Sequence, residues 1–318
     1  MAEHAKGFVV PIHQSLTKPV LMCGIPRDLF LLNGTFAASF VMMKCYPLIL
    51  VNVFLHVIAL SFAKKDEQFF EAFGTQLKYG VYADYGMHKD DLQDLLLFHS
   101  SRGDKPITLA EYVENMPEDQ KYIYYCAGES VEKIEALPQT ELLRDKGYEI
   151  LYLTDNVDEF AVKVLMRHGG KEFRSVSEGD LGIDSEAEKE ETKKLAEDNK
   201  DMLALMKEAL GDKIKEAKIS DKLKTHPVCI SSAGQISLEM ERILNQNPQN
   251  ERVTSEKVLE LNPNHEIFGI MKGLYDSDKE KFKNYTSLLY DQALIIEGMP
   301  IEDPVGFADK LCKLMAEK

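Results

Sequence analysis

The distribution of charge along this chain changes abruptly at Ala63–Lys64. Residues 29–63 form an apolar run with one formal charge, Lys44, whereas the residues from Lys64 onward are dense in charge. A soluble core is patterned by the period of its helices and strands, and not by long blocks of one residue type. The sequence therefore predicts two parts that meet near this point, and the function of each has to be considered separately.

The net charge also differs between the two parts. Residues 1–63 carry a net charge of +2 and the whole chain carries −15, so residues 64–318 carry −17. Binding to nucleic acid requires clustered Lys and Arg side chains that neutralise phosphates. We therefore expect no nucleic-acid partner, and we expect residues 64–318 to lie in the cytoplasm.

The cysteines predict neither a metal site nor a disulfide framework. They are widely separated and none forms a CxxC pair: Cys23, Cys45, Cys126, Cys229 and Cys312. Metal sites need close ligand pairs, and disulfide frameworks are denser than this. We expect reduced thiols that mostly fill small apolar spaces.

The apolar run predicts a hairpin of two membrane-spanning helices. Residues 29–43 are 15 uncharged residues and residues 45–63 are 19, with Lys44 near the expected turn. A spanning helix needs roughly 20 apolar residues. Basic residues flank both ends of the run, which places both termini in the cytoplasm: Lys18, Arg27, Lys64 and Lys65. The alternative is a buried hairpin in a soluble protein.

A first family resemblance rests on three motifs in this region: residues 12–19 (IHQSLTKP), 24–27 (GIPR) and 31–35 (LLNGT). Together they resemble the TrbD-like family of small inner-membrane subunits of conjugative-transfer and type IV secretion systems. The resemblance covers about residues 8–73. It implies a membrane component of a secretion channel, located in the inner membrane if the hairpin inserts, with no catalytic residues.

The acidic part begins with alternating strand and helix patterns. Aromatic-rich or apolar runs predict strands at residues 121–127, 149–153 and 172–176, and helical patterns at residues 131–137 and 157–168 separate them. Strands that alternate with helices at this spacing predict a small parallel α/β layer.

Local signals predict several helix starts. A hydroxyl side chain followed three residues later by Glu is typical of a capping box, and this pattern occurs at Thr108–Glu111, Ser185–Glu188 and Ser277–Glu280. Asp155 follows a predicted strand. We interpret it as a helix N-cap, which is a more common role for such a residue than that of a catalytic acid.

A highly charged segment, residues 178–201, runs into an amphipathic helix that ends at Gly211 and marks a domain boundary. Two predicted strands, a helix and a polar loop follow, at residues 213–219, 228–231, 235–245 and 247–256. Two amphipathic helices end the chain. Their apolar faces carry Phe282, Tyr285, Leu288, Leu289, Ala293 and Ile296, and then Phe307, Leu311, Leu314 and Met315. These faces either cover the preceding layer or meet the same pair of helices from a second copy in a four-helix bundle.

A second family resemblance covers about residues 69–318. Its motifs are residues 69–81 (FFEAFGTQLKYGV), 119–125 (DQKYIYY), 141–147 (ELLRDKG), 153–155 (LTD) and 260–263 (ELNP). They closely resemble bacterial members of the heat shock protein 90 chaperone family. The resemblance implies a mixed α/β and α+β fold, with residues 1–66 as the membrane hairpin, 67–180 as part of a middle domain, 181–212 as a charged linker and helix, and 213–318 as a C-terminal dimerisation domain.

The resemblance also implies functional surfaces. It favours a homodimer through the last two helices, with Phe282, Tyr285, Leu289, Ala293, Ile296, Phe307, Leu311 and Leu314 at the interface. A helix at residues 232–244 would present Ile236, Met240 and Leu244 to unfolded or partly folded client proteins, because Met and aliphatic side chains suit promiscuous contacts. The alternative is that these three residues pack on the domain core.

Intact members of that family use ATP. The resemblance implies that their nucleotide site and catalytic Arg precede the matched region, so we expect no cofactor and no ATPase activity in this chain. Three hypotheses follow. The chain is a truncated, ATP-independent chaperone tethered to the membrane, a secretion subunit with a passenger tail, or a chimera without a selected function. Residues 66–73 match both families and would be the point of joining.

Overall fold

The computed structural model describes residues 21–22, 25–26, 67–183, 185–246 and 251–316. The chain divides into two units, Met1–Leu97 and Phe98–Lys318. No helix in the described part of the chain is both long enough and apolar enough to cross a membrane. The predicted spans, residues 29–43 and 45–63, lie outside the described residues.

The first unit contains a short β-hairpin and a group of helices. One face of the long helix α4 buries Phe73, Leu77 and Val81 at intervals of four residues. A Cβ atom at Gly80 would lie 2.9 Å from the Leu92 side chain, so glycine allows this close approach. The elements are β1 (Leu21–Met22), β2 (Ile25–Pro26), α4 (Glu67–Tyr82), η1 (Ala83–Gly86), α5 (Lys89–Leu92) and η2 (Gln93–Leu95).

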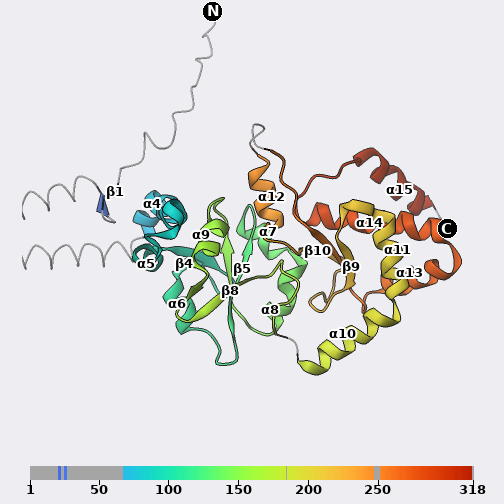
Figure 1. The fold of residues 1–318 in the computed structure, drawn as a ribbon, viewed down its shortest axis with the longest axis horizontal. Coiled ribbons are helices and arrows are strands. Elements are labelled where there is room, and N and C mark those ends of the chain that lie inside the picture. Colours follow the sequence, from blue (N-terminus) through green and yellow to red (C-terminus); the bar gives the residue numbers. More distant parts are fainter. Residues whose placement is uncertain (1–20, 23–24, 27–66, 184, 247–250, 317–318) are drawn as a thin grey trace, which may run out of the picture. The chain divides into compact units, whose positions relative to one another are not determined.

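A six-stranded sheet with the order β4-β3-β6-β5-β8-β7 opens the second unit (Figure 1). Its strands are β3 (Leu97–Ser100), β4 (Gly103–Thr108), β5 (Tyr122–Ala127), β6 (Ile150–Leu153), β7 (Arg167–His168) and β8 (Lys171–Ser175). β5 runs parallel to both β6 and β8, which confirms the predicted parallel layer. β3 and β7 extend it as antiparallel strands.

Helices between these strands complete a first core. They are α6 (Leu109–Glu114), α7 (Val131–Glu135), η3 (Pro138–Thr140), α8 (Glu141–Asp145) and α9 (Asp158–Leu165). Ile134 of α7 and Leu143 of α8 are fully buried in one cluster with the strand residues Tyr124 and Tyr152. Burial of such large apolar side chains stabilises the layer.

The C-terminal part of the second unit surrounds a three-stranded sheet with the order β10-β11-β9. β11, the last of the three in the sequence, lies between the other two, antiparallel to β10 and parallel to β9. The elements are α10 (Glu186–Asp198), α11 (Lys200–Leu210), η4 (Gly211–Lys213), β9 (Glu216–Ile219), β10 (Val228–Ser232), α12 (Leu238–Leu244), β11 (Lys257–Leu261), α13 (Glu266–Ser277), α14 (Lys279–Ile296) and α15 (Pro304–Ala316).

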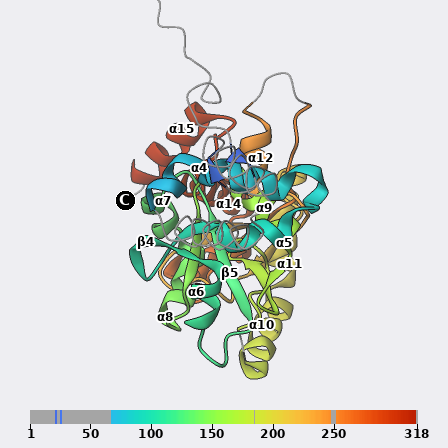
Figure 2. The same ribbon diagram turned by 90° about the vertical axis from the view of Figure 1, so that its left-hand side faces the viewer.

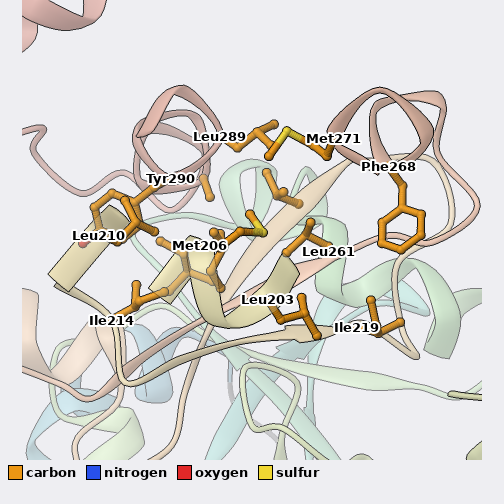
Figure 3. Packing of buried hydrophobic residues seen from close by; sticks show 14 of the residues in the cluster. Leu203, Met206, Leu210, Ile214, Ile219, Leu261, Phe268, Met271, Leu289 and Tyr290 are labelled. Carbon is orange, nitrogen blue, oxygen red and sulfur yellow. The ribbon is translucent and has the colours of Figure 1, made fainter. Parts of the chain in front are cut away.

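A second core joins this sheet to its helices. Figure 1 shows α11, α13 and α14 gathered around β9 and β10. Met206 of α11 lies among Leu261 of β11 and the helical residues Met271 and Leu289 (Figure 3). By contrast, α10 buries none of its residues. Helices α10 and α15 lie on opposite sides of this unit in both views (Figure 1, Figure 2).

Two of the predicted capping boxes are confirmed and one is wrong. Thr108 and Ser185 each form the reciprocal hydrogen bonds of a capping box. At the third position Asp278 caps α14 instead, because its carboxylate accepts from the Lys281 backbone N–H at 3.0 Å, whereas Ser277 donates to the Gly273 carbonyl. The next residue along the chain therefore provides the cap.

The predicted role of Asp155 is also wrong. Helix α9 begins three residues later, at Asp158, and its N-cap residue is Val157. The backbone N–H of Asp155 donates to the carboxylate of Asp158 at 3.0 Å. The N-cap residue of α9 makes no side-chain hydrogen bond, and the carboxylate that holds the preceding turn belongs to the first residue of the helix. The amphipathic helix that was predicted to end at Gly211 is confirmed: Gly211 caps α11 with a φ of 56°, a conformation that favours glycine.

Candidate functional site

The predicted client-binding residues lie on and just before α12. Met240 and Leu244 share one face of this helix, four residues apart, whereas Ile236 precedes its N-cap residue, Ser237. All three side chains are partly exposed. The helix begins at Leu238 and is shorter than the predicted range of 232–244, because Ser237 has an extended backbone and serves as the N-cap residue.

Polar contacts connect the N-terminal end of α12 to α9. The Ser237 hydroxyl donates to Glu159 Oε2 at 2.5 Å and accepts from the Met240 backbone N–H at 3.0 Å. Lys163 Nζ donates to the Gln235 carbonyl at 2.6 Å and lies 3.2 Å from Met240 Sδ. Burial raises the pKa of the Glu159 carboxyl. Two residues of α9 therefore position the segment that carries Met240.

Charged contacts fix the other side of α12. Arg242 donates to Glu239 within the helix and to Glu129 Oε1 at 2.9 Å, and these partners raise the pKa of its guanidinium. Glu241 accepts from Lys257 Nζ of β11 at 2.6 Å. Leu238 is the one buried residue that α12 contributes. The placement of this helix therefore depends mainly on polar contacts, and no local sequence signal identifies their partners.

The predicted dimerisation residues fall into two groups. Phe282, Leu289 and Ala293 are buried in the core of the same chain, with exposed fractions of 0%, 6% and 1%. The predicted face of α14 therefore packs largely on its own domain, which is the alternative in which this helix covers the preceding layer. The others are partly or largely exposed: Tyr285, Ile296, Phe307, Leu311 and Leu314.

Helix α15 presents apolar side chains and buries none of its residues. Val305 is 72% exposed, Leu311 40% and Met315 78%. Asp303 caps the helix by accepting from the Gly306 backbone N–H at 2.9 Å, and Lys310 Nζ donates to Ser287 of α14 at 2.8 Å. The helix is thus attached to α14 while its apolar residues remain open to a further surface.

An ion network fixes the joint between the two sheets of the second unit. Glu178 and Ser232 form a single parallel bridge. Lys222 Nζ donates to the Glu178 carbonyl at 2.7 Å and lies 3.2 Å from Glu260 Oε1, and both charged side chains are fully buried. Burial alone would raise the pKa of the Glu260 carboxyl, but the ammonium groups of Lys222 and Lys218 hold it below its ordinary value. Sequence patterns did not identify this network.

Of the three cysteines that the structure describes, two fill buried positions as predicted. Cys126 and Cys229 are free and buried, and burial raises the pKa of each thiol well above its ordinary value. Cys312 is free and exposed on α15. The two buried thiols therefore act as small core side chains.

Residues 42–318 match the family model described as Hsp90 protein. The chain is similar to chaperone protein HtpG of Clostridium perfringens, with 59% identity over 249 residues, which are 78% of this chain and 40% of that relative. It is also similar to chaperone protein HtpG of Clostridium acetobutylicum, with 57% identity over 260 residues (80% and 41%). The same protein of Bacillus licheniformis is 54% identical over 253 residues (80% and 40%).

These matches bear on both family resemblances. The chain spans about two fifths of the length of the curated relatives that it matches. The family match begins at residue 42, inside the region, residues 8–73, whose motifs resemble a secretion subunit. The comparisons give no support to the resemblance to a secretion subunit.

Proposed function

The chain belongs to the heat shock protein 90 family, and we propose that residues 67–318 hold unfolded client proteins and pair with a second copy of the chain. The observation that carries this proposal is the 54–59% identity to chaperone protein HtpG over about four fifths of the chain. Identity at this level over that many residues supports a shared fold and shared surfaces. ATP-driven steps are not part of the proposal.

The client surface in this proposal is the exposed face of α12 with the segment before it. Ile236, Met240 and Leu244 are partly exposed, and Met and aliphatic side chains adapt to many apolar partners. Their backbone is held by Glu159 and Lys163, so the surface is preorganised while its side chains stay adaptable.

Suppression of aggregation of a model unfolded protein tests the client surface. We expect that about tenfold more of the Met240→Asp variant is required for the same suppression of aggregation, because the new carboxylate would lose its hydration on contact with the client. Ile270→Asp provides the matched control, since Ile270 is an exposed aliphatic residue on α13. Equal suppression by wild type and Met240→Asp would reject α12 as the client surface.

The dimer surface in this proposal is α15 with the exposed residues of α14. It rests on the exposed side chains Ile296, Phe307, Leu311, Leu314 and Tyr285, and not on the residues buried within the protomer. Helix α15 buries none of its residues within the chain, and its apolar side chains would become buried if the same helices of a second copy packed against it.

Attachment to the inner membrane by residues 29–63 is a further part of the proposal, with residues 67–318 on the cytoplasmic side. It rests on the two uncharged stretches of 15 and 19 residues and their basic flanks. The match of the chaperone family from residue 42 onward favours one continuous protein over a secretion subunit with a passenger tail.

A further inference from the structure

A cavity of about 200 Å³ lies between α7, α9, α12 and the end of α14. It is separate from the exposed face of α12, because Leu238, Glu239 and Arg242 line it whereas Met240 and Leu244 do not. One wall is apolar and consists of Ile134, Leu137, Leu238, Ile295, Ile296 and Met299. The remaining wall carries carboxyl groups and two basic side chains.

Two of the carboxylates in the cavity have cationic partners. Glu129 pairs with Lys133 and lies 2.9 Å from Arg242 Nη1. Glu239 accepts from Arg242 Nε at 2.8 Å. Two acidic and two basic groups therefore balance one another at this side of the cavity.

A third carboxylate, Glu159, is also partnered. It accepts from the Ser237 hydroxyl at 2.5 Å and lies 3.8 Å from Lys163 Nζ. Its environment thus supplies a hydrogen bond and a nearby positive charge.

The fourth carboxyl group, Glu297, forms no ion pair with any residue that the structure describes, although the charge of Lys222 partly opposes the rise in its pKa. Its hydrogen-bond donor is the neutral amide of Gln139, which also donates to the Ile230 carbonyl. Glu297 is the C-cap residue of α14, where the carbonyl end of the helix disfavours a negative charge. Burial raises the pKa of this carboxyl to about 7.

An unsatisfied acceptor lies beside it. Gln139 is fully buried, and in the described part of the structure its Oε1 atom has no hydrogen-bond donor. A buried acceptor without a donor costs about 1–3 kcal/mol. Gln139 adjoins the Glu297 side chain but is not one of the residues that line the cavity, so Glu297 is the acceptor that this pair offers to the cavity.

We propose that this cavity binds an alkylammonium group, with Glu297 as its counterion. An ammonium group offers a positive charge, three donors and no acceptor, which suits a cavity-lining carboxylate that forms no ion pair with a described residue. A short aliphatic chain would pack on the apolar wall. The ligand is a small aliphatic amine or the side chain of a lysine. The site is distinct from the client face of α12 and shares only Ile296 with the residues named for the dimer surface.

Binding should depend on pH through Glu297. Below pH 7 the carboxyl is largely protonated and provides no counterion, so the affinity for an ammonium group rises as the pH increases from 6 to 8, and binding near pH 7 releases a proton. Alkyl ammonium groups and Lys and Arg side chains remain charged throughout this range. The other titratable or charged groups that face Glu297 or the cavity are Cys126, Glu129, Lys133, Glu159, Lys222, Cys229, Glu239 and Arg242.

Isothermal titration calorimetry of the full chain with n-butylamine tests the proposal, with 1-butanol as the uncharged probe. We expect butylamine to bind at pH 8 and butanol not to bind. Glu297→Gln should weaken butylamine binding by at least about tenfold, since it keeps the shape and removes the charge. Glu191→Gln, an exposed carboxylate on α10, should change nothing.

Titrations of the wild-type chain at pH 7 in two buffers of different ionisation enthalpy measure proton release without any variant. No butylamine binding, or equal binding to wild type and Glu297→Gln, would overturn the proposal, and so would binding without proton release. A titration with N-acetyl-lysine amide distinguishes the source: tighter binding than butylamine indicates a lysine side chain, and weaker binding a free amine. Either result leaves the client and dimer tests unaffected.

Discussion

Lys222 and Glu260 form an ion pair that is fully removed from water. Removing two charges from water costs several kcal/mol, which their mutual attraction and further hydrogen bonds must offset. Here Ser220 donates to Glu260 at 3.0 Å, and Lys222 donates to the backbone carbonyl of Glu178, in the segment after β8. The pair therefore specifies how the segment after β8 meets the C-terminal sheet, more than it adds stability.

Removal of one partner should be costly. We expect Lys222→Met to lower the free energy of unfolding by about 3 kcal/mol, because it leaves the Glu260 carboxylate buried with Lys218 as its remaining cation. The double variant Lys222→Met/Glu260→Met should recover most of that loss. Urea unfolding monitored by circular dichroism measures both. A loss below about 1 kcal/mol in the single variant would mean that water or Lys218 already neutralises Glu260.

At the scale of elements, α15 is a helix whose stability within the protomer comes from few contacts. We expect Leu311→Asp to convert a dimer to a monomer at micromolar concentration, since the new carboxylate would be desolvated at the interface. Analytical ultracentrifugation of the full chain measures the mass. Lys313→Asp on the same helix is the control and should leave the dimer intact, because residue 313 is exposed and residues two positions apart on a helix do not share a face. A wild-type monomer would reject the dimer surface.

Sequence patterns predicted the elements whose signals are local. The aromatic and apolar runs of β5, β6 and β8 and the capping box of α10 are examples. They missed β11, because Lys257 and Glu260 interrupt its apolar pattern, although both are buried. Their partners, Glu241 and Lys222, are distant in the sequence, so no local pattern reveals that these charges are neutralised inside a strand.

The same limit applies to the candidate site. Apolar spacing correctly predicted that Phe282 and Leu289 lie on one helical face, but it could not decide what covers that face. The structure shows that the protomer itself covers it. The contacts of Glu159 and Lys163 with the segment before α12 were not predictable either, since they depend on tertiary packing.

At the scale of the whole molecule, the sequence predicts two environments, the membrane for the apolar residues 29–63 and water for the acidic remainder. We expect the full chain to stay with the inner membrane after an alkaline carbonate wash, because 19 consecutive uncharged residues, 45–63, nearly span the hydrocarbon core. The variant Leu50→Asp/Leu55→Asp should be released, since each charge in the core costs about 2.5–3.5 kcal/mol. Recovery of the wild-type chain in the soluble fraction would exclude the membrane hairpin.

The position of β11 has a consequence for synthesis on the ribosome. Because this strand lies between β9 and β10 but follows both in the sequence, the C-terminal sheet cannot assemble until Leu261 has left the exit tunnel. Until then β9 and β10 lack the neighbour that joins them, and unpaired strands are prone to associate with other chains. A stalled nascent chain whose last emerged residue lies between residues 232 and 257 should therefore depend on protection by other cellular factors, and this dependence should end soon after β11 emerges.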